Sequence, residues 1–416
     1  MRSSMQDLKT RDPEIAGLTS SESKRVQSTL NLIAAENHPP LNVLEAQGSI
    51  FMGKVIEGYP GNRYHSGCQF ADEVENLAIE RCQQLFKAEA VNVQPHSGTS
   101  ANLAVYFAVL DIGDKILSMN LQHGGHLSHG HQASITSRCF QFEHYGVNPE
   151  TELIDYDAMA TIAARFQPRM IVAGASSYPR LIDYEKIYHI AKKHKAFFMV
   201  DMAHIAGLVA SQVIPSPVPF ADFVTFTCYK TLIGCRGGVI IAKEKYSKAI
   251  NRSIFPGCQG TSGVNQIAAK AVTFQNALQP DFKKIQLNTL KNANVLAHEL
   301  AGKGYHLVSG GTDNHQVLID LADRSISGQL AETTLEKADI LCNRNVTPKD
   351  ALTPGSVSGI RLGTAALTTR GFKENEFKQV AHLIDTAIRH SHNSSQQKTV
   401  KDKVSELCHL FPVYDV

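Results

Sequence analysis

The chain has 416 residues, of which 43% are hydrophobic and 19% are charged, and its formal net charge is +2. These values are ordinary for a globular protein, give no indication of nucleic-acid binding, and leave room for two domains. No run approaches the roughly 18 apolar residues of a membrane helix, and residues 1–10 lack the apolar core of a signal peptide. The eight cysteines include no Cys-x-x-Cys pair. We therefore expect no metal site and a cytoplasmic location in which the thiols stay reduced.

The first predicted elements are a polar arm over residues 1–30 and a helix around Ser21–Leu32. From about residue 90 to 240, helical stretches alternate with short apolar runs that resemble strands. Largely apolar strands with helices between them are typical of a mostly parallel sheet that is buried on both faces. The predicted strands are Asp114–Ser118, Arg169–Ala173, Ala196–Val200, Phe223–Phe226 and Gly238–Ala242.

The C-terminal part begins with Val264–Leu296, which is helical by its spacing. The strand candidates Gly304–Val308, Gln316–Asp320 and Gly359–Leu362 then alternate with helices, as in a smaller α/β domain. We therefore predict an α/β fold with an N-terminal arm at 1–30, a large domain at 31–280 and a C-terminal small domain at 281–416.

Lys230 and Asp201 carry the strongest chemical signal. Lys230 follows a β-rich run and precedes a glycine-bearing turn, and Asp201 ends the predicted strand upstream of it. A lysine that holds the aldehyde and an aspartate that holds the pyridinium nitrogen are the two groups that pyridoxal phosphate needs. The pattern therefore indicates a pyridoxal phosphate site.

Two further segments could complete such a site. His96–Asn102 places small hydroxyl residues and a glycine before a helix, which suits a phosphate, although a plain helix N-cap is the alternative. His123–Gly130 is rich in histidine and glycine. Metal binding is one interpretation, but no carboxylate or cysteine stands at ligand spacing, and an imidazole stacked on a flat ring fits better. His204 follows the Asp201 strand at the edge where open α/β sites form, or is a buried structural histidine.

The loop 54–65 and Arg361 are candidates for substrate contacts. The loop contains one carboxylate, Glu57, among rings and cations, so Glu57 is a candidate proton carrier, and an ordinary surface loop is the alternative. Arg361 lies in a strand-like run. A buried arginine needs a partner, which could be a substrate carboxylate or a structural ion pair.

In their order, these segments resemble the serine hydroxymethyltransferase family of fold-type I pyridoxal phosphate enzymes, and the chain is similar to a divergent member from about Leu32 to its C-terminus. The resemblance implies a homodimer with shared active sites that moves a hydroxymethyl group from serine to tetrahydrofolate and leaves glycine. The matching segments are Leu32–Asn37, Glu57–Gly61, Val93–Gly98, Met119–Leu121, His126–Leu127, Val200–His204, Val308–His315 and Ser358–Thr364.

The resemblance also implies residue roles. Lys230 would form the Schiff base, Asp201 would bind the pyridinium nitrogen, and His126 would stack on the ring. The implied catalytic set is Lys230, Glu57, His126, Asp201 and His204. The remaining cofactor contacts are Ser97, Gly98 and Thr99 at the phosphate, Ser176, His204 and Thr227, and Gly260 from a partner subunit. The substrate set is Arg361, His65, Glu57 and Tyr64, and the folate set is Leu121, Gly125, Leu127 and Asn345.

The chain departs from the family pattern at positions close to the implied substrate. Losing one hydrogen bond to a charged group costs roughly 1.5–3 kcal/mol, so two or three losses would weaken serine binding by orders of magnitude unless another group compensates. The departures are Ala35 for serine, Val55 and His65 for tyrosines, Cys228-Tyr229 for Thr-His, Cys235 for proline and Thr261 for glycine.

Three functions follow from this pattern. The first is a folate-dependent hydroxymethyltransferase that acts on serine and glycine or on a close analogue such as 2-methylserine. The second is a folate-independent aldolase or transaldolase on β-hydroxy amino acids, with His65 as an altered base. The third is a catalytically silent relative that binds partners, which the intact Lys230 and Asp201 disfavour.

Overall fold

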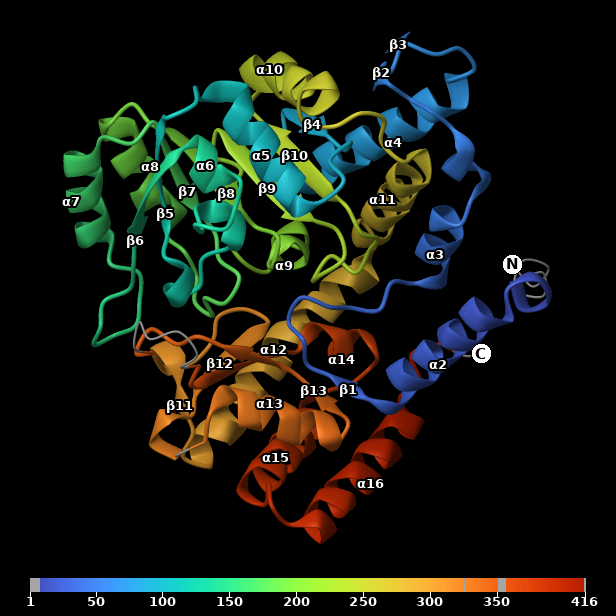
Figure 1. The fold of residues 1–416 in the computed structure, drawn as a ribbon, viewed down its shortest axis with the longest axis vertical. Coiled ribbons are helices and arrows are strands. Elements are labelled where there is room, and N and C mark those ends of the chain that lie inside the picture. The colour runs from blue at the N-terminus through green and yellow to red at the C-terminus, as the bar shows by residue number, and fades with distance from the viewer. Residues whose placement is uncertain (1–7, 325, 351–356, 415–416) are drawn as a thin grey trace.

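The computed structural model describes residues 8–324, 326–350 and 357–414. A seven-stranded sheet lies at the centre of one half of the molecule (Figure 1). Its order is β4-β10-β9-β8-β7-β5-β6; β10 is antiparallel to both neighbours and the other pairs are parallel, which confirms the predicted α/β fold. The strands are β4 (Ala90–Asn92), β5 (Lys115–Met119), β6 (Gln141–Tyr145), β7 (Met170–Ala173), β8 (Phe197–Asp201), β9 (Phe223–Thr227) and β10 (Gly238–Ala242).

All the strands predicted for this sheet are present, with ends that shift by one residue at most. Two strands of this seven-stranded sheet, β4 and β6, were not predicted. Both lie at an edge of the sheet, and β4 has only 3 residues. The β6 sequence Gln-Phe-Glu-His-Tyr carries exposed polar side chains, because an edge strand is not covered on all sides. Neither therefore shows the apolar run of a central strand.

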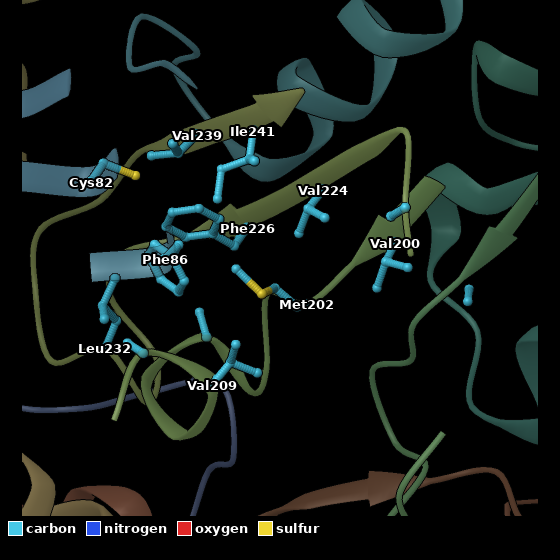
Figure 2. Packing of buried hydrophobic residues seen from close by; sticks show 14 of the residues in the cluster. Cys82, Phe86, Val200, Met202, Val209, Val224, Phe226, Leu232, Val239 and Ile241 are labelled. Atoms are coloured by element: carbon cyan, nitrogen blue, oxygen red, sulfur yellow. The ribbon is translucent and has the colours of Figure 1, made fainter. Parts of the chain in front are cut away.

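Helices bury both faces of this sheet. Successive side chains of a strand point to opposite faces, so Ile116 packs with one cluster and Leu117 with the other. Figure 2 shows the second cluster, where Phe86, Phe226 and Val209 converge from a helix, a strand and a short helix. One face carries α5 (Gly98–Val109) and α10 (Ser247–Arg252); the other carries α4 (Gln69–Phe86), α7 (Tyr156–Phe166), α8 (Tyr184–Lys193), α9 (Ala206–Ala210) and α11 (Val264–Ala277).

A second sheet lies in the other half of the molecule (Figure 1). It packs with a separate apolar cluster. This antiparallel sheet has the order β11-β12-β15-β14. The predicted helical stretch Val264–Leu296 is two helices, since Pro280 begins a new one. The division at 280 stays our prediction. The elements are α12 (Pro280–Gly302), β11 (His306–Leu307), β12 (Gln316–Asp320), α13 (Gly328–Lys337), β14 (Asn343–Asn345), β15 (Gly359–Gly363), α14 (Ala365–Thr369), α15 (Glu374–Arg389) and α16 (Ser394–Leu410).

The N-terminal helix differs from its prediction. It is α2 (Pro13–Ser28), capped by Asp12, and no residue of it is buried. The expectation that it reaches Leu32 is wrong, because β1 (Leu30–Asn31) pairs with β13 (Ile340–Leu341) and packs with the C-terminal cluster. Nowhere in the described ranges is a helix long and apolar enough to cross a membrane. The remaining elements are α3 (Leu41–Gln47), the hairpin β2 (Gly58–Tyr59) and β3 (Asn62–Arg63), and α6 (Thr136–Cys139).

Candidate active site

The structure brings the predicted lysine and aspartate together at one edge of the seven-stranded sheet. Asp201 ends β8, Thr227 ends β9, and Lys230 follows in the next turn. The carboxyl ends of parallel strands are where open α/β sheets form their sites. One cavity there is lined by every residue of the predicted cofactor set except Gly260. Its lining is Ser97, Gly98, Thr99, His126, His129, Ala175, Ser176, Asp201, Ala203, His204, Thr227, Tyr229 and Lys230.

Lys230 is almost completely buried, and burial lowers the pKa of its ammonium group to about 8. The carboxylate of Asp201 opposes this shift, whereas the guanidinium groups of Arg361 and Arg236 add to it. The side-chain amide of Asn37 donates a 2.9 Å hydrogen bond to the carbonyl oxygen of Lys230 and fixes the turn. Because of the lowered pKa, a larger fraction of this lysine is neutral near pH 7, as attack on an aldehyde requires.

Three groups orient the carboxylate of Asp201. Its Oδ2 accepts a hydrogen bond from Nδ2 of Asn102 at 2.8 Å and lies 3.2 Å from Nε2 of His129. Its Oδ1 accepts from the backbone N–H of Ala203 at 3.0 Å. Burial alone raises the pKa of this carboxyl, but His129, the charge of His126 and the Asn102 hydrogen bond outweigh it and bring the pKa below its ordinary value. Asp201 therefore stays ionised and can hold a cation or an N–H group in the cavity.

Asn102 and His129 are site residues that the sequence motifs did not single out. Besides Asp201, Asn102 bonds the hydroxyl groups of Thr225 at 2.6 Å and Ser128 at 2.9 Å, so its amide is held at both ends. The signal for Asn102 was its place four residues after Gly98 in a helix, which puts both on one face. His129 stood in the histidine-rich segment, but its spacing alone did not distinguish it from the neighbouring histidines.

The histidine-rich segment forms turns above the cavity. Nδ1 of His126 accepts a hydrogen bond from the backbone N–H of Ser128 at 3.1 Å, and burial lowers the pKa of His126 to about 4. The imidazole is therefore neutral near pH 7, as expected of a ring that stacks on an aromatic cofactor. In the part of the chain that the structure describes, no group of three histidine, cysteine or carboxylate side chains could hold a metal ion.

His204 and Thr227 line the same cavity and carry polar atoms that are unpaired within the described part of the chain. Burial brings the pKa of His204 well below its ordinary value, and its ring stacks on that of His315 with centroids 5.7 Å apart. Nδ1 of His204 and Oγ1 of Thr227 are buried without a hydrogen-bond partner among the described residues. Buried polar atoms are normally paired. Together with Lys230 and Asp201, these atoms fit pyridoxal phosphate, whose ring substituents and phosphate offer the missing partners.

The turn before α5 is a helix N-cap and is also suited to bind a phosphate, which are the two interpretations of its sequence. Ser97 caps the helix: its Oγ accepts from the N–H of Ser100 at 3.1 Å, and its own N–H donates to Oγ of Ser100 at 2.8 Å. Gly98 and Thr99 occupy the first turn, where N–H groups have no partner inside a helix. A side chain at Gly98 would lie 2.8 Å from Cγ2 of Thr227. The glycine thus keeps the turn close to β9. The free backbone N–H groups of the first turn of α5 suit a phosphate.

Arg361 reaches from β15 to the loop that follows β7. Its Nη1 donates to the carbonyl oxygen of Ser176, and its Nε donates to Oδ1 of Asn343 at 3.0 Å. Burial lowers the pKa of this guanidinium to about 10. Among the residues that the structure describes, its hydrogen-bond partners are neutral oxygens, and no ion pair of Arg361 is found there. A guanidinium with neutral partners can still bind a substrate carboxylate.

The Glu57 loop is a rigid hairpin. Nη1 of Arg63 donates to the carbonyl oxygen of Gly58 at 2.7 Å, and its Nη2 lies 2.6 Å from the buried carboxylate of Glu75. The carbonyl oxygen of Glu57 accepts from the N–H of Tyr64 at 3.0 Å. A buried ion pair with further hydrogen bonds fixes the backbone around Glu57.

The structure does not place this hairpin in the Lys230 cavity of the same chain. Tyr64 is 75% exposed, His65 is exposed, and neither they nor Glu57 belong to the cavity lining. Gly260 is also exposed, with open space where a side chain would begin. The roles of these residues therefore stay predictions.

The predicted folate residues lie beside the cavity or on β14. Leu121 and Leu127 are 39% and 53% exposed on turns that follow β5. Gly125 lies between them in the sequence, and a Cβ there would lie 2.3 Å from the carbonyl oxygen of Met119. Leu121 shares a second cavity with His126 and His129, so it adjoins the Lys230 site. Asn345 ends β14, two residues from Asn343, the partner of Arg361.

One departure from the family pattern, Tyr229, lines this cavity. The guanidinium of Arg236 lies 4.3 Å from the centre of its ring, while Nζ of Lys230 lies 5.9 Å away. Cys228 is completely buried behind the same turn, and Val55 is 42% exposed. Tyr229 thus brings a phenol ring and a stacked cation to the reactive lysine.

A lysine, a hydrogen-bonded aspartate and a helix N-terminus that converge at the carboxyl ends of a mostly parallel seven-stranded sheet define a fold-type I pyridoxal phosphate enzyme. The family model of serine hydroxymethyltransferase matches residues 8–384 of the 416. The chain belongs to the serine hydroxymethyltransferase family and is a pyridoxal phosphate-dependent transferase. The chemistry of that family is hydroxymethyl transfer between serine and glycine in one-carbon metabolism.

Proposed function

We propose that the chain transfers a hydroxymethyl group from serine, or a close analogue such as 2-methylserine, to tetrahydrofolate and leaves glycine or the matching amino acid. The observation that carries this proposal is the cavity in which Lys230, Asp201, His126 and the turn before α5 meet. When bound, pyridoxal phosphate supplies an electron sink for the charge left on the amino acid.

The side chains have distinct tasks in this proposal. The carboxylate of Asp201, which stays ionised, would keep the ring nitrogen protonated. His126, as a neutral imidazole, would cover one face of the ring. Lys230 would hold the cofactor through its amine. Its lowered pKa supports this role, because the neutral amine is the form that reacts with an aldehyde.

The amino acid and its hydroxymethyl group need further contacts. Arg361, whose present partners are neutral oxygens, would bind the substrate carboxylate. Glu57 would hold or move the proton of the hydroxymethyl group, with Tyr64 and His65 nearby. The exposure of Tyr64 and His65 supports a site completed by a second copy of the chain, which would also bring Gly260 to the phosphate. We therefore propose a homodimer with shared active sites.

Folate would bind against Leu121, Gly125, Leu127 and Asn345. Two exposed leucines next to His126 give an apolar surface that a flat pterin or benzoyl group would cover. A cytoplasmic location is part of the same proposal, and each of the eight cysteines is a free thiol.

A second candidate is a folate-independent aldolase or transaldolase on β-hydroxy amino acids. The observation that favours it is the set of departures near the lysine, with Tyr229 in the cavity and His65 on the Glu57 loop. In this case His65 would remove the β-hydroxyl proton.

One experiment separates the two. The chain purified with pyridoxal phosphate is given glycine, and exchange of the glycine α-hydrogen with deuterated water is followed by NMR with and without tetrahydrofolate. Exchange that folate accelerates supports the hydroxymethyltransferase. Fast exchange that folate leaves unchanged, with cleavage of a β-hydroxy amino acid, supports the aldolase. A chain that neither binds pyridoxal phosphate through Lys230 nor exchanges glycine contradicts both.

A further inference from the structure

Lys270, on α11, is a buried cation that the proposed chemistry does not use. Its side chain is 1% exposed, and burial lowers the pKa of its ammonium group. Nζ donates to three backbone carbonyl oxygens, those of Val93 at 2.6 Å, Pro95 at 3.0 Å and Gly238 at 2.9 Å. An ammonium group has three N–H donors, whereas a neutral amine has only two. Three carbonyl acceptors around one nitrogen therefore match the charged form.

These three carbonyls belong to the two backbone segments that shape the turn before α5. Val93 and Pro95 lead into Ser97, and Gly238 begins β10. The N–H of Gly238 also donates to the carbonyl oxygen of Pro95 at 3.0 Å. A Cβ at Gly238 would lie 2.2 Å from the carbonyl oxygen of Ser97, so the two backbones touch. Lys270 thus links the segment between β4 and the turn to the first residue of β10.

The neighbouring glycine is shaped around the same ammonium group. Gly237 has a φ of +146°, and a Cβ there would lie 2.3 Å from Cε of Lys270. The Lys270 side chain therefore fills the space that an ordinary residue at 237 would need. Among the described residues, the hydrogen-bond acceptors of Nζ are carbonyl oxygens, and no carboxylate forms an ion pair with it, although the charge of Glu75 raises the pKa of Lys270.

We propose that Lys270 is a positioning residue for the cofactor phosphate: from behind the turn it fixes the backbone at Ser97 and Gly98 and adds a buried positive charge to that side of the site. This inference rests on the proposed pyridoxal phosphate site. Phosphate is bound as an anion, and a buried charge in a medium of low dielectric constant acts over a longer distance than a charge in water. Lys270 need not touch the cofactor to act in this way.

The test compares pyridoxal phosphate with pyridoxal, which has the same ring and aldehyde but no phosphate. Full-length wild type and Lys270→Met are stripped of cofactor and titrated with each compound, and binding is followed by the visible absorbance of the bound ring. We expect Lys270→Met to weaken the binding of pyridoxal phosphate about tenfold or more, because the backbone at Ser97 and Gly98 loses its support and that side of the site loses a positive charge. The binding of pyridoxal should weaken less than about threefold. The phosphorus NMR signal of bound pyridoxal phosphate should also shift.

The matched control is Arg370→Met. Arg370 is likewise a buried cation that donates to backbone carbonyls, those of Thr29 at 2.9 Å and Cys408 at 2.9 Å, but it lies in the C-terminal half. Its loss should lower the unfolding midpoint and leave the preference for pyridoxal phosphate over pyridoxal unchanged. A purely structural Lys270 would behave like Arg370.

Each outcome decides a different claim. If Lys270→Met weakens the binding of pyridoxal phosphate and of pyridoxal equally, or leaves the preference for pyridoxal phosphate unchanged, the positioning role is overturned and the proposed function stands. Wild type that binds neither compound contradicts the proposed function itself. If Lys270→Met does not fold, Lys270→Gln undergoes the same titrations; if that variant also fails to fold at saturating pyridoxal phosphate, Lys270 supports the fold and the positioning role is overturned.

Discussion

The side-chain amide of Asn102 on α5 donates a 2.8 Å hydrogen bond to Oδ2 of Asp201 at the end of β8. The hydroxyl of Thr225 on β9 donates to the other end of that amide at 2.6 Å. Because His129 adds a contact of 3.2 Å, a helix, two strands and a turn jointly fix one carboxylate. Its orientation toward the cavity thus depends on the tertiary structure, and its charge depends on these donors.

The first prediction concerns that charge. Asp201→Asn should lower the rate of glycine α-hydrogen exchange by about tenfold or more, because a neutral amide cannot hold the ring nitrogen protonated. The measurement is NMR exchange at saturating pyridoxal phosphate. The control is Asp222→Asn, a buried carboxylate that accepts from the N–H of Phe198 at 3.0 Å, at the opposite end of β8. Exchange at the wild-type rate in Asp201→Asn would contradict the role of Asp201 at the ring nitrogen.

Arg361 gives the second prediction. Arg361→Gln should raise the Michaelis constant or the dissociation constant for glycine by about 10- to 100-fold, since a charge-assisted, two-pronged contact with the carboxylate is lost. Affinity for pyridoxal phosphate should hardly change. Arg344→Gln, an exposed arginine on the neighbouring β14 that faces Glu332 at 3.5 Å, is the control. Comparable losses in both variants would contradict a carboxylate-binding role.

The third prediction concerns acid stability. The pKa of His315 in the folded chain is lowered to about 3 by burial, whereas an unfolded histidine has a pKa of about 6.5. Between these values the unfolded chain takes up a proton that the folded chain does not, so acid favours unfolding. His315 should lower the free energy of unfolding by up to about 1.4 kcal/mol for each pH unit below 6.5.

Urea unfolding of wild type and His315→Gln at pH 7, 6 and 5 measures this contribution. The variant should show a shallower fall of the free energy of unfolding toward low pH, at equal protein and cofactor concentrations. His298→Gln, at an exposed position on α12, should keep the wild-type slope. Parallel curves for all three proteins would contradict the prediction.

His65 provides the fourth prediction, on substrate preference. The resemblance places a tyrosine at this position, so His65→Tyr should raise kcat/KM for serine by about tenfold if the chain is a weakened serine enzyme. If kcat/KM falls both for serine and for 2-methylserine or another β-hydroxy amino acid, His65 serves a different substrate. The ratio of kcat/KM values for serine and 2-methylserine is the quantity to compare.

The fifth prediction addresses the second copy of the chain. Lys230→Ala and Glu57→Ala should each be nearly inactive. If Glu57 completes the site of its partner, a heterodimer has one intact site, and an equal mixture should regain about a quarter of the wild-type activity after subunit exchange. Size-exclusion chromatography should show a dimer. A mixture that stays inactive after exchange would place Glu57 and Lys230 in one chain's site.

The sequence determined much of this by local pattern. The apolar runs specified the strands of the parallel sheet, because a strand that is buried on both faces must be apolar on both faces. Asp201 was recognisable because it stands at the end of such a run, and Lys230 because it lies in the turn after one. The edge strand β6 was not predicted from the sequence, because an exposed edge tolerates polar residues. The end of α2 was misplaced because β1 pairs with β13, which is distant in the sequence.

Only the tertiary structure decided which polar residues act together. Asn102 and His129 are separated along the chain, yet they meet at the Asp201 carboxylate, and Thr225 holds the amide of Asn102 from the other side. Asp201 stands there because the carboxyl ends of parallel strands lie at one edge of the sheet. In the sequence, nothing distinguishes Lys270 from other lysines in helices. Only the packing of the chain places its ammonium group among three carbonyl oxygens. A residue's chemistry can be read from its type, but its partners and its pKa depend on burial and on distant segments, which no local pattern contains.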